Sequence, residues 1–167
     1  MKIFLSHGRG SSQHSKEMHR LARIAKENGH HAYRINDTDT EDPELRAERL
    51  IQLVDEAKED ILLVGFSMGG YTSMLAAAAY PDKVKGLFLL APALYAPRYK
   101  VKTYPIIHPT VIIHGWNDDI ILYEHSVGYA REARATLHLV DAAHTFLESD
   151  ELDVISHHFQ KFLTYFL

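Results

Sequence analysis

Short apolar runs alternate along the chain with longer amphipathic stretches. Six of these runs have the length and composition of β-strands. They are Ile3–Leu5, His31–Ile35, Ile61–Val64, Leu87–Leu90, Val111–Ile113 and Leu137–Val140. Three of them are continuously apolar and do not alternate with polar residues, which is typical of strands that a parallel sheet buries on both faces.

The amphipathic stretches between the runs predict helices, because their apolar residues recur at helical spacing. The predicted helices are one around 18–25 that Asn28-Gly29 ends, one around 47–54 that begins at Asp42-Pro43, one from just after Ser67 to before Pro81, one over about 122–133, and a last one with Ile155, Phe159, Phe162 and Phe166 on one face. Strands that alternate with helices imply right-handed crossovers. The expected fold class is therefore α/β, a doubly wound, mostly parallel six-stranded sheet with helices on both faces.

Residues 91–109 interrupt this alternation. They show no clear periodicity and contain four of the six prolines, together with Tyr95, Tyr99 and Tyr104. Irregular segments of this length inside a domain are usually functional loops. The segment is a candidate for a short lid, and the alternative is a proline-stiffened surface crossover.

Composition and charge narrow the class of protein. A chain of 167 residues predicts one domain over 1–167. With 18 basic and 22 acidic residues the net charge is -4, so the basic excess expected of a nucleic-acid partner is absent. The chain has no cysteine, which excludes disulfides and a thiol nucleophile. No stretch is long enough to cross a membrane and there is no signal-peptide core, so we expect a cytoplasmic protein without a membrane partner. The 12 histidines show no metal-ligand spacing.

One motif carries nucleophile chemistry. Gly65-Phe66-Ser67-Met68-Gly69 follows the third predicted strand and precedes an alanine-rich helix, as a G-x-S-x-G turn does. Such a turn strains the serine backbone and projects the hydroxyl above the sheet edge. The helix N-terminus behind it suits a developing oxyanion.

A serine nucleophile needs a base and a third group that orients the base. In this topology the acid and then the histidine should follow the serine, each in a loop after a strand. Candidate acids follow the fifth strand in His114-Gly115-Trp116-Asn117-Asp118-Asp119, and the candidate base follows the sixth strand in Asp141-Ala142-Ala143-His144.

These three motifs, in this order, resemble the α/β-hydrolase family, in particular its small esterase-like members without a cap domain. The family's acid loop commonly reads His-Gly-x-x-Asp, which falls on His114, Gly115 and Asp118, and the base loop matches at His144-Thr145-Phe146. The resemblance implies Asp118 as the acid, with Asp119 as a rival that the sequence leaves open. Leu122 stands where the family usually has proline.

The resemblance also implies the rest of the site. The two oxyanion donors would be the backbone N–H groups of Met68 and Arg9, with Gly8 as the next choice after Arg9. We expect Gly8, Tyr95 and Trp116 to contact the substrate. No strand precedes the first predicted one, so a minimal sheet in the order 2-1-3-4-5-6 is implied.

The function that this resemblance implies is a serine hydrolase that cleaves a small-molecule carboxylic ester or thioester through an acyl-enzyme on Ser67. It would need no metal and no organic cofactor. Two alternatives stay open: an amidase or peptidase on the same triad, and a non-catalytic interaction domain with a hydrolase-like fold. Arg98, Lys100 and Lys102 in residues 91–109 would favour an anionic substrate.

Overall fold

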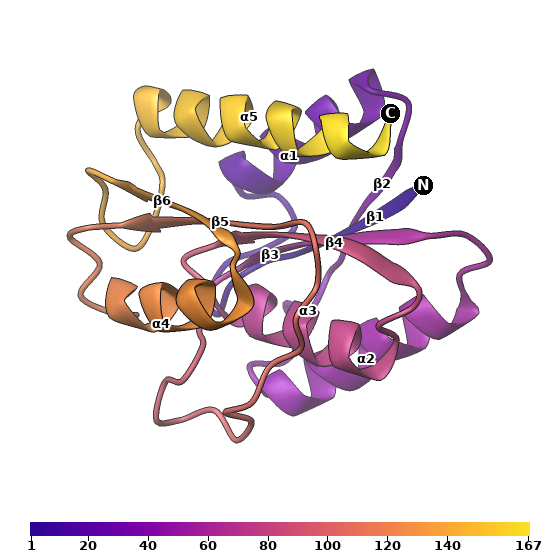
Figure 1. The fold of residues 1–167 in the computed structure, drawn as a ribbon, viewed down its shortest axis with the longest axis horizontal. Coiled ribbons are helices and arrows are strands. Elements are labelled where there is room, and N and C mark those ends of the chain that lie inside the picture. Colours follow the sequence, from indigo (N-terminus) through magenta and orange to yellow (C-terminus); the bar gives the residue numbers. More distant parts are fainter.

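A parallel six-stranded sheet runs through the middle of the molecule (Figure 1). The computed structural model describes residues 1–167. Its strands are Lys2–Ser6 (β1), His31–Arg34 (β2), Ile61–Phe66 (β3), Val84–Leu90 (β4), Thr110–Gly115 (β5) and Thr136–Val140 (β6). Their order is β2-β1-β3-β4-β5-β6, all in parallel pairs, which confirms the predicted fold class and order.

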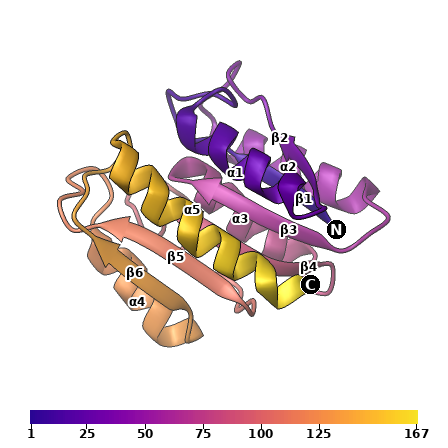
Figure 2. The same ribbon diagram turned by 90° about the horizontal axis from the view of Figure 1, so that it is seen from above.

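Five α-helices cover the two faces of the sheet. They are Lys16–Glu27 (α1), Pro43–Glu56 (α2), Met68–Ala79 (α3), Tyr123–Ala133 (α4) and Ser149–Leu163 (α5). Helices α1 and α5 lie on one face, and α2, α3 and α4 lie on the other (Figures 1 and 2). The sequence predicts Phe166 as part of the last helix, but α5 ends at Leu163 and Phe166 belongs to a following 3-10 turn.

The helix boundaries follow the local signals in the sequence. Asp42 caps α2, since its Oδ1 accepts a hydrogen bond of 3.0 Å from the Glu44 N–H, and Pro43 occupies the first helical turn. After α1, Gly29 adopts φ +79°, a left-handed conformation that glycine tolerates without strain. The loops that carry the site connect these elements.

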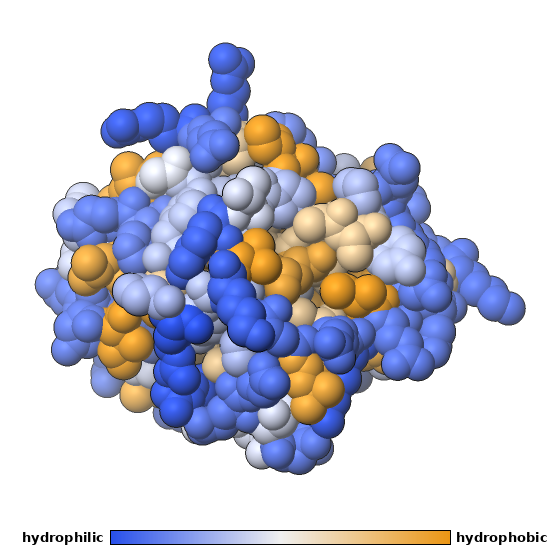
Figure 3. Space-filling view, turned by 90° about the horizontal axis from the view of Figure 1, so that it is seen from below, coloured by the Kyte–Doolittle hydropathy of each residue, from blue (hydrophilic) through white to orange (hydrophobic).

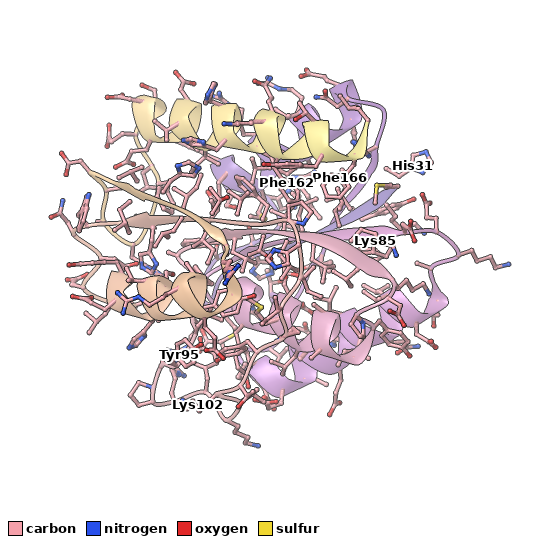
Figure 4. All side chains as sticks on the ribbon, in the orientation of Figure 1. His31, Lys85, Tyr95, Lys102, Phe162 and Phe166 are labelled. Carbon is pink, nitrogen blue, oxygen red and sulfur yellow. The ribbon has the colours of Figure 1, made fainter.

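Apolar side chains fill both sides of the sheet. One buried cluster packs α1 and α5 against the face of the sheet that is uppermost in Figure 1, with Leu21, Phe88 and Phe159 among its members. The other joins the lower face to α2, α3 and α4. Phe162 and Phe166 lie between α5 and the sheet (Figure 4). Double-sided burial explains the uninterrupted apolar runs 61–64, 87–90 and 111–113 within the central strands β3, β4 and β5.

Residues 91–109 connect the parallel strands β4 and β5 without a helix and pass beneath the lower helices in Figure 1. Tyrosine hydroxyls hold this segment in place. Tyr71 of α3 accepts a hydrogen bond from the Val101 N–H at 3.1 Å, and Tyr104 donates one to the Val101 carbonyl at 2.8 Å. Tyr129 of α4 donates to the Pro105 carbonyl at 2.8 Å. The segment is therefore packed against α3 and α4 along much of its length.

Hydrophilic side chains dominate the face that carries the lower helices, where apolar residues form several separate patches (Figure 3). None of the helices has both the length and the apolar character that a membrane-spanning helix needs.

The burial of His30 predicts that the stability of the protein depends on pH. It is buried, and neither ring nitrogen has a hydrogen-bond partner. Burial lowers the pKa of His30 from its ordinary value of 6.5, with smaller contributions from the N-terminal amino group and His31. The folded protein thus binds this proton more weakly than the unfolded chain does. The unfolding free energy therefore has its full value above the ordinary histidine pKa of 6.5 and falls as the pH drops below it.

Replacing His30 with leucine should therefore reduce the loss of unfolding free energy between about pH 7.5 and about pH 5. Urea unfolding at several pH values measures this loss, and His157→Gln, at an exposed histidine, serves as the control. Equal pH dependence in wild type and His30→Leu would contradict the assignment.

Candidate active site

The sheet order brings two loops together at one edge. Strands β1 and β3 are neighbours, and their register pairs Ser6 with Gly65. The chain leaves β1 toward α1 and β3 toward α3, on opposite faces of the sheet. Ligands of open α/β sheets bind at such a switch point, outside the carboxyl ends of the strands. Here it places the loop after Ser6 beside Ser67.

Ser67 occupies a strained turn between β3 and α3. Its φ of 52° and ψ of -114° are rarely adopted by residues other than glycine. Hydrogen bonds hold it from both sides: its N–H donates to the Leu90 carbonyl at 2.9 Å, and its carbonyl accepts from the Ala93 N–H at 3.0 Å. The end of β4 and the start of residues 91–109 thus hold Ser67 in its strained conformation.

Two glycines allow the turn to form. A Cβ added to Gly69 would lie 2.0 Å from the Ser6 carbonyl oxygen, and one added to Gly65 would lie 2.3 Å from the Gly69 carbonyl oxygen. Both contacts are with backbone, which cannot rotate away. The close approach of α3 to β1 and β3 therefore depends on these two residues having no side chain.

A row of hydrogen bonds joins the three predicted catalytic side chains. His144 Nε2 lies 3.0 Å from Ser67 Oγ, and His144 Nδ1 lies 2.7 Å from Asp118 Oδ2. A carboxylate only accepts, so Nδ1 carries the hydrogen and Nε2 accepts from the serine hydroxyl. All three residues are buried. The Phe66 ring packs against the His144 ring, with centroids 5.2 Å apart.

Asp118 is the most completely bonded of the three. Its Oδ1 accepts from the backbone N–H groups of Ile120, at 2.9 Å, and Ile121, at 2.8 Å. Burial raises the pKa of a carboxyl, but hydrogen bonds from His114, His144 and the Ile121 N–H outweigh it and hold the pKa of Asp118 well below its ordinary value. Asp118 is therefore ionised at neutral pH.

The two neighbouring aspartates, Asp119 and Asp141, do not contact His144. Asp119 is exposed and makes none of the hydrogen bonds that hold Asp118. Asp141 accepts a hydrogen bond of 2.8 Å from the side chain of Asn117 and so ties the acid loop to the base loop. Only Asp118 faces His144.

The loop after β1 is fixed by a buried histidine and a buried arginine. Burial lowers the pKa of His7, whose neutral ring donates from Nδ1 to the Gly8 carbonyl at 2.8 Å and accepts the Asp37 N–H at Nε2, at 3.1 Å. Arg46 of α2 donates to the His7 and Gly8 carbonyls at 3.3 and 3.4 Å. The His7 and Gly8 carbonyls are thus bonded to His7 Nδ1 and Arg46, and the Cα of Gly8 lies against Phe66 and Ser67.

A pocket of about 590 Å³ opens over Ser67 and His144. Its walls come from four loops. The lining residues are Arg9 and Gly10, Glu41, residues 96–99, and Ile120 and Ile121. Arg9 Nε donates to Glu41 Oε2 at 2.8 Å, which leaves Arg98 as the lining residue whose charge has no ionic partner.

None of the three residues predicted to contact the substrate lines this pocket: Gly8 packs against Phe66, and Tyr95 and Trp116 have other partners. Tyr95 points toward α4 and packs against Tyr104 and His125, with ring centroids 5.1 and 6.2 Å apart. Figure 4 shows it beside α4. Trp116 packs against Tyr123 at 4.9 Å and is half exposed. Each side chain thus has an aromatic partner on α4, His125 for Tyr95 and Tyr123 for Trp116.

Sequence reasoning missed Glu41, Tyr99, Ile120 and Ile121 as pocket residues. Glu41 precedes the cap of α2 and carries no motif. The two isoleucines could have been predicted from their position, because they follow Asp118 by two and three residues in the loop that brings this acid to His144. No three histidine or carboxylate side chains converge into a metal site.

Comparisons with known proteins agree with this architecture. A family model described as serine aminopeptidase, S33, matches residues 46–107, just over a third of the chain. A protein of the α/β superfamily of hydrolases from Xanthomonas campestris pv. campestris is 24% identical, with a TM-score of 0.90 over 98% of each chain. No curated protein sequence matches the chain.

Two further solved structures are similar. Est1E from Butyrivibrio proteoclasticus is 20% identical, with a TM-score of 0.82 over 98% of this chain and 87% of that one, and another structure of Est1E holds ferulic acid. A serine hydrolase without a lid from Xanthomonas campestris is 23% identical, with a TM-score of 0.73 over 99% of this chain and 82% of that one. The chain therefore has the α/β-hydrolase fold.

The close approach at Gly69 predicts a large stability cost for a single methyl group. Gly69→Ala should lower the unfolding free energy by about 2 kcal/mol or more, because the new Cβ meets backbone that must shift. Gly128 in α4 is the control, since nothing lies within 4 Å of its added Cβ, and Gly128→Ala should stabilise by about 0.5–1 kcal/mol. Urea unfolding compares the two. Equal stability of both variants would contradict the packing described here.

Proposed function

We propose that this chain is a serine hydrolase that cleaves a carboxylic ester or thioester through an acyl-enzyme on Ser67. The observation that carries the proposal is the continuous row of hydrogen bonds from Ser67 Oγ through His144 to Asp118 at the floor of an open pocket. Fold alone would not carry it, because related folds host many activities.

In the proposed reaction His144 Nε2 accepts the proton of the Ser67 hydroxyl while Oγ attacks the substrate carbonyl carbon. The new C–O bond forms as the carbonyl oxygen takes up negative charge. The intermediate collapses when the bond to the leaving alcohol or thiol breaks and His144 returns the proton to it. Asp118 keeps the imidazole in the tautomer with hydrogen on Nδ1 and stabilises its protonated form.

The oxyanion needs donors that are already in place. Met68 is the first residue of α3, so its N–H has no acceptor within the helix and is available beside Ser67. The second proposed donor is the Arg9 N–H, in the loop that His7 and Arg46 hold. Water then attacks the acyl carbon with His144 as the base, the bond to Ser67 Oγ breaks, and His144 returns the proton to the serine as the carboxylic acid leaves. No metal or organic cofactor takes part in these steps.

The comparisons support hydrolase activity, and a similar structure described as an esterase domain favours an ester substrate. The S33 family description, serine aminopeptidase, favours the second candidate, an amidase or peptidase on the same residues. A panel of matched ester, thioester and amide substrates separates the two by their relative kcat/KM.

Covalent labelling tests the nucleophile. A fluorophosphonate probe should label wild type, because an activated serine attacks phosphorus, and Ser67→Ala should not be labelled. Asp118→Asn should lower kcat by about 10³-fold or more, whereas Asp119→Asn should retain most activity, since only Asp118 orients His144. Full labelling of Ser67→Ala, or the opposite ranking of the two asparagine variants, would overturn the assignment.

The pocket's charges point to the substrate's chemistry. Arg98 lines the pocket, lies 5.9 Å from the Tyr99 ring centroid, and has no carboxylate partner. Lys102 instead donates to the Ala96 carbonyl within its own loop, and Lys100 does not line the pocket. Among the three basic residues of this segment, Arg98 is thus the one that we propose to favour an anionic substrate.

Arg98→Gln should lower kcat/KM for a carboxylate-bearing ester by about two- to five-fold relative to its neutral analogue, the range expected of an exposed ion pair. The mono-p-nitrophenyl ester of adipic acid and p-nitrophenyl hexanoate supply a matched pair of equal chain length. Lys100→Gln is the control and should leave the ratio unchanged. An unchanged ratio in Arg98→Gln would remove Arg98 from substrate selection.

A further inference from the structure

A second histidine contacts the Asp118 carboxylate. His114 lies near the end of β5, and its side chain has no exposed surface. Its Nε2 lies 3.0 Å from Asp118 Oδ2 and 2.8 Å from the Ile121 carbonyl oxygen. Both of these oxygens only accept, so Nε2 carries a hydrogen and shares it between them.

The other side of the ring is held as firmly. His114 Nδ1 lies 2.8 Å from the hydroxyl oxygen of Ser126, which is fully buried in α4. The imidazole therefore bridges three parts of the fold: the sheet through β5, the turn of residues 118–121, and α4. Neither nitrogen is left to contact the substrate or Ser67.

We infer that His114 is a positioning residue for Asp118: by donating to the same carboxylate oxygen as His144, it fixes that oxygen in place and limits how strongly the carboxylate holds the His144 imidazole. The inference rests on the proposed function, which gives the Asp118–His144 contact its role. It goes beyond that function because His114 itself touches none of the reacting atoms.

The distribution of donors on the carboxylate carries the argument. Oδ1 accepts two backbone hydrogen bonds, so one oxygen is anchored by the turn alone. Oδ2 accepts only from the two histidines. Without His114, the whole charge on Oδ2 would face His144 in a buried site. A protonated His144 would then be favoured more strongly, and it would act as a base only at higher pH.

Other charged groups around His144 do not change when His114 is replaced. Across the pocket these are Arg9 from the loop after β1, Glu41 from the loop after β2, and Arg98 from residues 91–109. A change in the titration of His144 on replacing His114 therefore reports on the shared oxygen.

The experiment follows His144 by NMR titration of its ring, together with the pH profile of kcat/KM, in wild type, His114→Leu and His114→Gln. Leucine removes the donor, whereas the glutamine amide can still donate near the position of Nε2. His114→Leu should raise the titration midpoint of His144 and the acidic limb of the profile by about half to one pH unit. His114→Gln should move both back toward wild type.

Thr110→Val controls for the loss of a buried hydrogen bond on the same strand, because Thr110 Oγ1 donates to the Ile107 carbonyl at 2.6 Å, far from the carboxylate. It should lower stability without moving the midpoint. Should His114→Leu lose stability with an unmoved His144 midpoint, His114 would be a packing residue only and the inference would be wrong.

The NMR arm separates this inference from the proposed function. If the fluorophosphonate probe failed to label wild type, the hydrolase proposal would be overturned. The His144 titration midpoint would still report on the shared Asp118 oxygen. A labelled wild type with identical midpoints in all variants would overturn the inference alone.

Discussion

A carboxylate whose side chain is completely buried is costly unless donors surround both of its oxygens. Asp118 meets this requirement with two backbone N–H groups and two histidines. These donors come from three parts of the chain, so the carboxylate joins β5, the turn that follows it and the base loop after β6. The position of His144, and with it the distance to Ser67, depends on this one group.

A second constraint acts at the other end of the hydrogen-bonded row. Ser67 reaches its strained conformation because α3 starts close to the end of β1, and only glycine at position 69 leaves room for the Ser6 carbonyl. The same crossing brings the loop after β1 beside the serine. Packing at the sheet edge therefore delivers both the nucleophile and a proposed oxyanion donor to one place.

The connection between β4 and β5 shapes the pocket. Parallel strands β4 and β5 are joined by residues 91–109 rather than by a helix, and tyrosine hydroxyls from α3 and α4 hold that segment. Its residues 96–99 then form one wall of the pocket, opposite Arg9 and Glu41. A connection that is irregular in sequence thus becomes an ordered part of the site, and the substrate preference that we propose depends on which of its basic residues face inward.

Periodicity and turn residues were enough to predict the strands and the helices, because each depends on local spacing and on burial of one face or two. The order of the sheet came from the resemblance to the α/β-hydrolase family. The motif around Ser67 and the loops carrying Asp118 and His144 could likewise be read from short patterns.

Only the tertiary structure decided the rest. Asp118 and Asp119 are adjacent and chemically equal in sequence, yet only one can turn inward to the donors. Tyr95 and Tyr99 lie four residues apart in a segment without periodicity, and packing against α4 or α3 sends them in different directions. His114 shares a carboxylate oxygen with a residue 30 positions away. Such contacts depend on side-chain directions and long-range packing, which no local pattern encodes.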